Sequence, residues 1–155
     1  MICIGIDCGA KGGVSVLEDG KFIDGFRMPL IAQGKLKLVD TLKLDDMVHR
    51  ITGSFGQIII ELVHAMPKQG VASSFRFGQA TGAVEGWAMS TAVPVAWVSP
   101  AKWKRDLKLS SDKRASMDLA RLTFGADKRW DVLANDGIAE AALIGYWWHV
   151  NHGRK

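Results

Sequence analysis

Cysteine is scarce in this chain, and the two that occur, Cys3 and Cys8, lie at either end of one short apolar segment. Two cysteines cannot form the set of bridges that holds a small secreted domain together, and they suit a reducing compartment. No histidine lies at zinc-ligand spacing from a cysteine, which argues against a structural zinc site. We therefore expect a cytoplasmic domain that is stabilised by its hydrophobic core.

Long apolar runs are also missing. No stretch reaches the roughly 18 residues that a membrane-spanning helix needs, so we expect no membrane partner. The apolar N-terminal stretch is interrupted by Asp7 and is too short to be typical of a signal peptide. A Walker-type phosphate loop is absent, and no serine or cysteine nucleophile is paired with a base in the sequence.

The chain has 155 residues, which is enough for one domain over 1–155 with a sizeable core. Short runs rich in β-branched residues predict strands, and apolar residues at helical spacing predict helices. The predicted strands are 1–6, 14–17, 21–28, 57–62 and 94–98. The predicted helices are 36–51, 77–91, one that begins after Ser99, one from 110 or 111 to 124, and 135–150. This order predicts an α/β fold in which one mixed sheet begins with a three-strand antiparallel meander.

Acidic residues occur at the ends of several predicted elements. Asp7 ends the first strand before a glycine-rich turn, and Glu61 follows three isoleucines. Asp136 and Glu140 are four residues apart in the last helix, so they point from one face. A buried, unpaired carboxylate is costly, so Glu61 and Glu140 each need a basic side chain or a metal ion as a partner. Asp7 is equally compatible with turn capping, and Asp136 with an ordinary helix start capped by Asn135.

An oxygen-rich cluster of this kind suits Mg²⁺ or Mn²⁺. Two such ions can activate a water molecule and stabilise the leaving oxygen of a phosphodiester. The stretch from Ala101 to Trp130 adds nine basic residues against four acids, a net charge of +5, while the rest of the chain sums to −1. Such a local surface favours a polyanionic partner, although a solvated helix face has the same composition. The candidate contacts for such a partner are Lys102, Lys104, Arg105, Lys108, Lys113 and Arg114.

Four segments, in order, resemble RuvC-type Holliday junction resolvases, which are RNase H-like nucleases. The first is Gly5-Ile6-Asp7-Cys8-Gly9, and the second, similar to phage-type members, runs from Ile60-Glu61 through Phe75-Arg76-Phe77-Gly78. The basic segment begins at Ser99-Pro100-Ala101-Lys102-Trp103-Lys104, and the last acidic one is Asn135-Asp136-Gly137-Ile138-Ala139-Glu140.

The resemblance implies an RNase H-like mixed sheet with helices on both faces. It implies metal ligands at Asp7, Glu61, Asp136 and Glu140, and a lysine near the active site, for which Lys113 is the best match. Relatives carry a further acid or a histidine near the position of Asn135, so Asn135 is either natural or a substituted ligand. The expected activity is cleavage of branched DNA in a bacterial or phage-infected cytoplasm, by a homodimer that makes two symmetric cuts.

Two further features concern the substrate and the dimer. Phe75 or Phe77 could wedge into a junction, or pack under a loop that we expect over 63–75. Trp103 and Trp130 lie among basic residues, where an indole either stacks on an unpaired base or belongs to the core. Gly78, Gly82 and Gly86 recur on one helix, which suggests close packing on the sheet beneath or on the same helix of a second subunit.

Three alternative functions remain to be weighed. A non-cleaving module that binds branched DNA would have Asn135 as its only support. A ribonuclease H-type enzyme for RNA/DNA hybrids would carry the same carboxylates. An actin-like kinase or ATPase shares the opening strand and Asp-Gly turn, but it needs two such domains, for which 155 residues leave no room.

Overall fold

The computed structural model describes residues 1–64, 70–110 and 112–153, and the side chain of Lys113 lies outside the described part. Five strands form the main sheet in the order β3-β2-β1-β6-β7. Their bounds are β1 Ile2–Asp7, β2 Gly13–Glu18, β3 Lys21–Arg27, β6 Gln57–Glu61 and β7 Val95–Val98. β1 and β2 pair antiparallel, as do β2 and β3, whereas β1, β6 and β7 run parallel. The predicted mixed sheet with a leading meander is confirmed.

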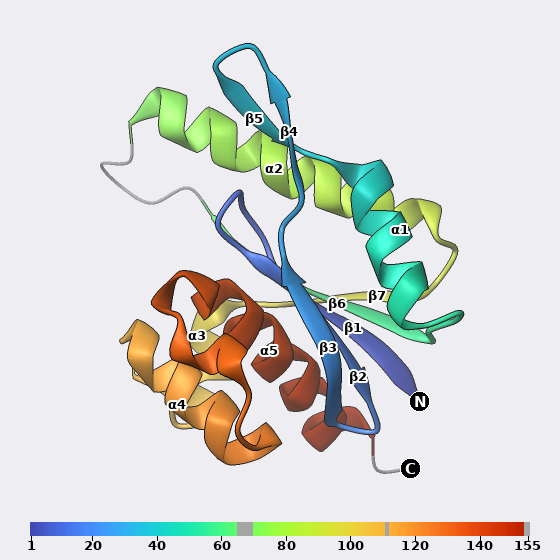
Figure 1. Cartoon of the computed structure of the whole chain (residues 1–155), viewed down its shortest axis with the longest axis vertical. Coiled ribbons are helices and arrows are strands. Elements are labelled where there is room, and N and C mark those ends of the chain that lie inside the picture. The colour runs from blue at the N-terminus through green and yellow to red at the C-terminus, as the bar shows by residue number, and fades with distance from the viewer. Residues whose placement is uncertain (65–69, 111, 154–155) are drawn as a thin grey trace.

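Helices cover both faces of this sheet, as expected (Figure 1). On one face lie α1 and α2, and on the other lie α3, α4 and α5 with two short 3-10 turns, η1 and η2. Their bounds are α1 Thr41–Ile51, α2 Val71–Ser90, α3 Pro100–Asp106, α4 Lys113–Phe124, η1 Lys128–Asp131, η2 Leu133–Asn135 and α5 Asp136–His152.

Side-chain alternation along the central strands supplies a core on each face. Ile4 and Ile6 of β1 pack with Val84 of α2 in one buried cluster, together with Ile58 and Ile60 of β6. Cys3 and Ile59 face the other way, into a cluster with Leu143, Ile144 and Trp147 of α5. Because both faces of β1 and β6 are covered, nearly every residue of these strands is apolar. The sequence therefore predicts them as buried strands.

The segment before α1 differs from the sequence prediction. A helix was expected from residue 36, but residues there form a second sheet of two strands, β4 Leu30–Gln33 and β5 Leu36–Val39. Leu38 and Leu42 are spaced as on a helix face, which extended the predicted helix too far. Asp40 is the actual N-cap, since its side chain accepts a hydrogen bond from the Lys43 amide.

The second difference lies at the start of α2. This helix begins at Val71 rather than residue 77, so the last part of the predicted loop is helical. Its first turns expose nearly every side chain, and they therefore lack the apolar periodicity on which the prediction relied. The other part of that loop, 65–69, lies outside the described residues. Within the described residues, no helix combines the length and hydrophobicity that a bilayer crossing requires.

Candidate active site

The two central parallel strands bring the first two acidic residues together. Ile6 of β1 is paired with Ile60 of β6, so the next residues, Asp7 and Glu61, end neighbouring strands at the same edge of the sheet. The two carboxyl groups influence each other, because the charge of Glu61 raises the pKa of Asp7. Glu61 is 6% exposed and lies beneath the surface, whereas Asp7 is partly buried.

Helix α5 carries the other two acidic residues. Its first turn lies against the β1–β2 turn, where Gly12 and Gly137 form an isolated parallel bridge. A Cβ atom on Gly137 would lie 2.6 Å from the carbonyl carbon of Gly12, which is closer than real side chains approach. Glycine is therefore required for the close contact that places Asp136 and Glu140 beside Asp7.

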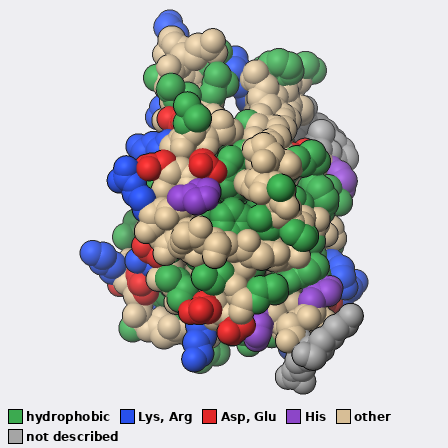
Figure 2. All heavy atoms as spheres, turned by 90° about the vertical axis from the view of Figure 1, so that its right-hand side faces the viewer, with side chains coloured by type: hydrophobic (Ala, Val, Ile, Leu, Met, Phe, Trp, Pro, Cys, Tyr) green, Lys and Arg blue, Asp and Glu red, His purple; other side chains and the backbone are tan. Residues whose placement is uncertain are grey.

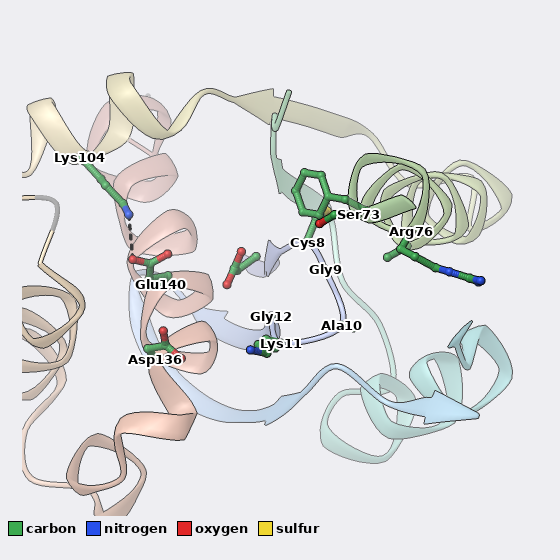
Figure 3. Close-up of a pocket in the computed structure, with 13 residues that line it drawn as sticks. Cys8, Gly9, Ala10, Lys11, Gly12, Ser73, Arg76, Lys104, Asp136 and Glu140 are labelled. Carbon is green, nitrogen blue, oxygen red and sulfur yellow. Dashed lines mark hydrogen bonds and ion pairs between the residues drawn. The ribbon is translucent and has the colours of Figure 1, made fainter. Parts of the chain in front are cut away.

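These residues line a hollow of about 500 Å³ at the end of the sheet. Asp7, Asp136 and Glu140 contribute carboxylates, while Lys104, Lys11 and Arg76 contribute positive charge. Figure 3 shows Asp136 and Glu140 on successive turns of α5, with Lys104 reaching Glu140 from α3.

Three donors hold the carboxylates in place. The Trp103 indole Nε1 donates to Glu61 Oε1 at 2.8 Å in a fully buried contact. Lys104 Nζ donates to Glu140 Oε1 at 2.8 Å, and the buried Ser116 hydroxyl donates to the same oxygen at 3.0 Å. Glu61 and Glu140 therefore have a defined orientation before any ligand is bound.

The carboxylates destabilise one another's charge. Burial raises the pKa of Asp7 well above its usual range, and the negative charges of Glu61, Glu140 and Asp136 raise it further, against the lowering effect of Lys104. Burial also raises the pKa of Glu61, while the Trp103 hydrogen bond acts in the opposite direction. The site thus concentrates negative charge that a single lysine only partly offsets.

The donor chemistry fits a hard divalent cation, because all four candidate ligands offer carboxylate oxygens. An additional positive charge would also lower the raised pKa values of Asp7 and Glu61, because it stabilises their ionised forms. Within the described residues, no three His, Cys, Asp or Glu side chains are arranged to hold an ion as they stand. In this structure Lys104 provides the positive charge at Glu140.

Asn135 is directed elsewhere. Its Oδ1 accepts a hydrogen bond from Arg27 Nε at 2.8 Å, and its Nδ2 donates to the Arg129 carbonyl at 3.2 Å. It occupies the N-cap position of α5 without a side-chain capping bond, so the predicted capping role is wrong. Asn135 is not among the residues that line the carboxylate hollow, and its amide ties α5 to β3 and η1 instead.

The basic segment is partly paired within the protein. Lys102 and Arg105 form ion pairs with Asp106, and Lys104 pairs with Glu140. Ser99 caps α3 as predicted by accepting from the Lys102 amide. Lys108 and Arg114 are exposed. The Lys113 side chain lies outside the described residues, and the described lysines that line the site are Lys11 and Lys104.

The aromatic candidates separate into two groups. Trp103 is fully buried and Trp130 is 2% exposed, so the stacking interpretation is wrong and both belong to the core. Phe77 lines the carboxylate hollow from α2. Phe75 is 63% exposed on the same helix and is not part of that lining.

Sequence reasoning missed the residues that support the acids. The indole of Trp103 and the hydroxyl of Ser116 bond to carboxylates that are 42 and 24 residues away in the chain. No local sequence pattern predicts contacts between residues so far apart in the chain. Lys11 could have been noticed, because it lies in the glycine-rich turn directly after Asp7. Arg76 belongs to the segment that had been interpreted as the end of a loop and the start of a helix.

No protein-family model matches the chain, and a search of curated proteins finds no match. Solved structures do match over nearly the whole chain. RuvC of Thermus thermophilus in complex with a Holliday junction substrate aligns with a TM-score of 0.70 and 17% identity, covering 98% of this chain and 96% of that one. The fold is that of RuvC.

A second structure of Thermus thermophilus RuvC aligns with a TM-score of 0.58 and 18% identity, over 97% of each chain. The yeast mitochondrial Holliday junction resolvase aligns with a TM-score of 0.57 and 17% identity, over 95% of this chain and 77% of that one. This likeness confirms the fold expected from the four sequence segments.

Proposed function

We propose that this protein is a metal-dependent endonuclease that resolves Holliday junctions and other branched DNA by paired phosphodiester hydrolysis. The observation that carries the proposal is the convergence of Asp7, Glu61, Asp136 and Glu140 from three separate elements of a RuvC fold. One structural relative is a RuvC bound to a Holliday junction, and another is a junction resolvase. Structural likeness at this identity supports the fold, and the acidic site supports the chemistry.

The four carboxylates would hold Mg²⁺ or Mn²⁺, and the bound ions would supply an activated water molecule and a countercharge for the leaving oxygen. The chain's own residues prepare this site. Trp103 and Ser116 fix one oxygen each of Glu61 and Glu140. Burial raises the pKa of both Asp7 and Glu61, which a bound cation would counteract. Lys104 lines the hollow, and its ammonium group is placed to contact a phosphate there.

Basic residues outside the hollow would bind the DNA arms. Lys102, Arg105, Lys108 and Arg114 lie on or next to α3 and α4, after the last central strand. Their contacts would be with phosphates and would carry no sequence information. We keep Lys113 and Phe75 as proposed DNA contacts on the strength of the sequence resemblance.

Self-association through α2 would supply the second active site. Gly78, Gly82 and Gly86 are exposed, and a Cβ on any of them would meet no atom of the described residues within 4 Å, so the stripe does not pack on the sheet and that interpretation is wrong. The buried side of the helix is formed by other residues, among them Val84 and Trp87. Figure 2 shows hydrophobic side chains gathered across a face that includes α1. A two-fold dimer would use this surface and place two sites for symmetric cuts.

The substrate experiment uses a labelled four-way junction, a linear duplex of the same sequence and an RNA/DNA hybrid, each with Mg²⁺ and with Mn²⁺. The proposal predicts cleavage of the junction well above the other two. Preferred cleavage of the hybrid would indicate a ribonuclease H-type enzyme instead. Tight junction binding without a cut in either metal would indicate a binding module, although Asn135, its only support, lies away from the hollow.

A further inference from the structure

The β4–β5 hairpin is an arm that stands apart from the main sheet. Among the described residues its two strands pair only with each other, and they are joined by a tight turn in which Gly34 has a φ of 61°. Figure 1 shows the arm extending beyond α2. Val39 at its base is part of the core, but every residue from Ile31 to Lys35 is exposed. Most of the arm therefore has no role in packing within the chain.

The arm carries uncompensated positive charge. Lys35 and Lys37 are exposed, and no acidic residue occurs from Met28 to Val39. Figure 2 shows Lys and Arg side chains at the end of a projection of the molecule. In the part of the chain that the structure describes, neither lysine forms an ion pair, and the same holds for Lys11 and Arg76. By contrast, the basic residues of α3 are paired with carboxylates.

A continuous depression links the arm to the acidic site. A second hollow of about 270 Å³ is lined by Lys37 and Arg76. It meets the carboxylate hollow at shared lining residues, namely Ala10, Arg76 and Ala80. Figure 3 shows Arg76 on α2, directed away from Asp136 and Glu140. The order along the depression is therefore carboxylates, then Arg76, then Lys37.

We propose that the β4–β5 arm, together with Lys11 and Arg76, binds the phosphate backbone of a DNA strand on the side of the active site opposite α3. This inference rests on the proposed function and adds a second contact region to it. A phosphate that enters this hollow, which is lined by three carboxylates with Glu61 buried beneath them, is repelled until countercharge is supplied. Lys104 supplies it on one side, and Lys11, Arg76 and the arm supply it on the other. A nucleic acid strand, with its regularly spaced negative charges, matches such a row of cations.

The test compares two double variants that each remove two positive charges. Lys35→Gln/Lys37→Gln alters the arm, and Lys21→Gln/Lys43→Gln is the control, because both of its lysines are exposed and Lys21 lies at the far end of the sheet from Asp7. Binding of a fluorescein-labelled four-way junction is measured by anisotropy in EDTA over a series of KCl concentrations, so that no cleavage occurs. Thermal unfolding of each variant checks that the fold is kept.

For the arm variant we expect the slope of log K against log salt to become shallower by about 1.8, which corresponds to two lost phosphate contacts. Between about 50 and 200 mM KCl this variant should lose roughly 12-fold less affinity than the wild type does. The control should keep the wild-type slope. Arg76→Gln should reduce the slope by about 0.9 in the same way.

The outcomes separate this inference from the proposed function. If the wild type binds the junction no better than a duplex, the proposed function fails. If the wild type binds the junction and the arm variant keeps the same slope, the arm does not contact DNA. Light scattering measures the molar mass of each variant as a further check. If the arm variant no longer forms the dimer, the arm takes part in self-association, and the inference is overturned.

Discussion

Replacing Asp7 by asparagine is predicted to stabilise the metal-free protein. Asp7 is held among three other carboxylates, and burial and their charges raise its pKa well above the usual range. Asparagine has nearly the same shape, and its amide can donate a hydrogen bond toward the neighbouring Glu61 carboxylate. The substitution therefore removes an unfavourable charge while it preserves the local packing.

The size of this stabilisation and its dependence on pH follow from the same contacts. Between the unfolded pKa, about 4, and the higher native pKa, the folded protein binds more protons than the unfolded chain, so stability falls as pH rises through that window. Above the native pKa the penalty is complete. Relief of such strain at a functional site typically gains about 1 to 2 kcal/mol, which for a chain of this size raises Tm by about 2 to 8 °C.

The assay is thermal and urea unfolding in EDTA at several pH values, with Asp118→Asn as the matched control because Asp118 is 75% exposed. The gain in Tm of Asp7→Asn over wild type should be small near pH 4 and should grow as the pH rises from the unfolded pKa of Asp7 toward its higher native pKa. Saturating Mg²⁺ should then raise the Tm of the wild type more than that of Asp7→Asn. An Asp7→Asn protein that is less stable than wild type by the same amount at every pH would refute the assigned electrostatics.

Three other substitutions test the supports of the site. Trp103→Phe removes the buried donor to Glu61 and should lower the free energy of unfolding in urea by about 1.5 to 3 kcal/mol. It should also shift the acid limb of the pH–rate profile to higher pH, because the hydrogen bond from Trp103 lowers the pKa of Glu61. Ser116→Ala should cost about 1 kcal/mol and weaken Mg²⁺ binding in calorimetry, since Glu140 loses one of two donors. Gly5→Ala should lower the free energy of unfolding, measured by thermal denaturation, by at least about 3 kcal/mol, because its Cβ would lie 2.1 Å from a carbonyl oxygen of α5. Unchanged stability in any of the three variants would contradict the contact concerned.

The central part of the fold was predictable because its signals are local. The segments that form β1, β2, β6 and β7 are apolar runs bounded by glycine or polar residues, and β3 follows a hairpin turn at Asp19-Gly20. Ser99-Pro100 is a strong helix start. The β4–β5 hairpin was missed because its leucines fit a helical spacing as well as a strand alternation. Only the pairing of Leu30–Gln33 with Leu36–Val39 decides between the two.

The candidate site was predictable only in its acids. Asp7 and Glu61 stand out because each carboxylate follows a buried strand, and their meeting follows from parallel pairing of those strands. The supports could not be predicted, because Trp103 and Ser116 reach the acids across the folded core. Charge counting also drew attention to the segment from Ala101 to Trp130. The cations of the β4–β5 arm are fewer, and their relation to the site appears only in three dimensions.

Paired cutting of a junction tests the central claim most directly. A supercoiled plasmid that extrudes a cruciform is incubated with the wild type and with Asp7→Asn in Mg²⁺, and gel shift in EDTA confirms that both bind the junction. The account predicts linear plasmid from the wild type, because two symmetric cuts occur in one complex, and intact supercoiled plasmid from Asp7→Asn. Uncut plasmid with the wild type in both Mg²⁺ and Mn²⁺, or equal cutting by Asp7→Asn, would contradict it.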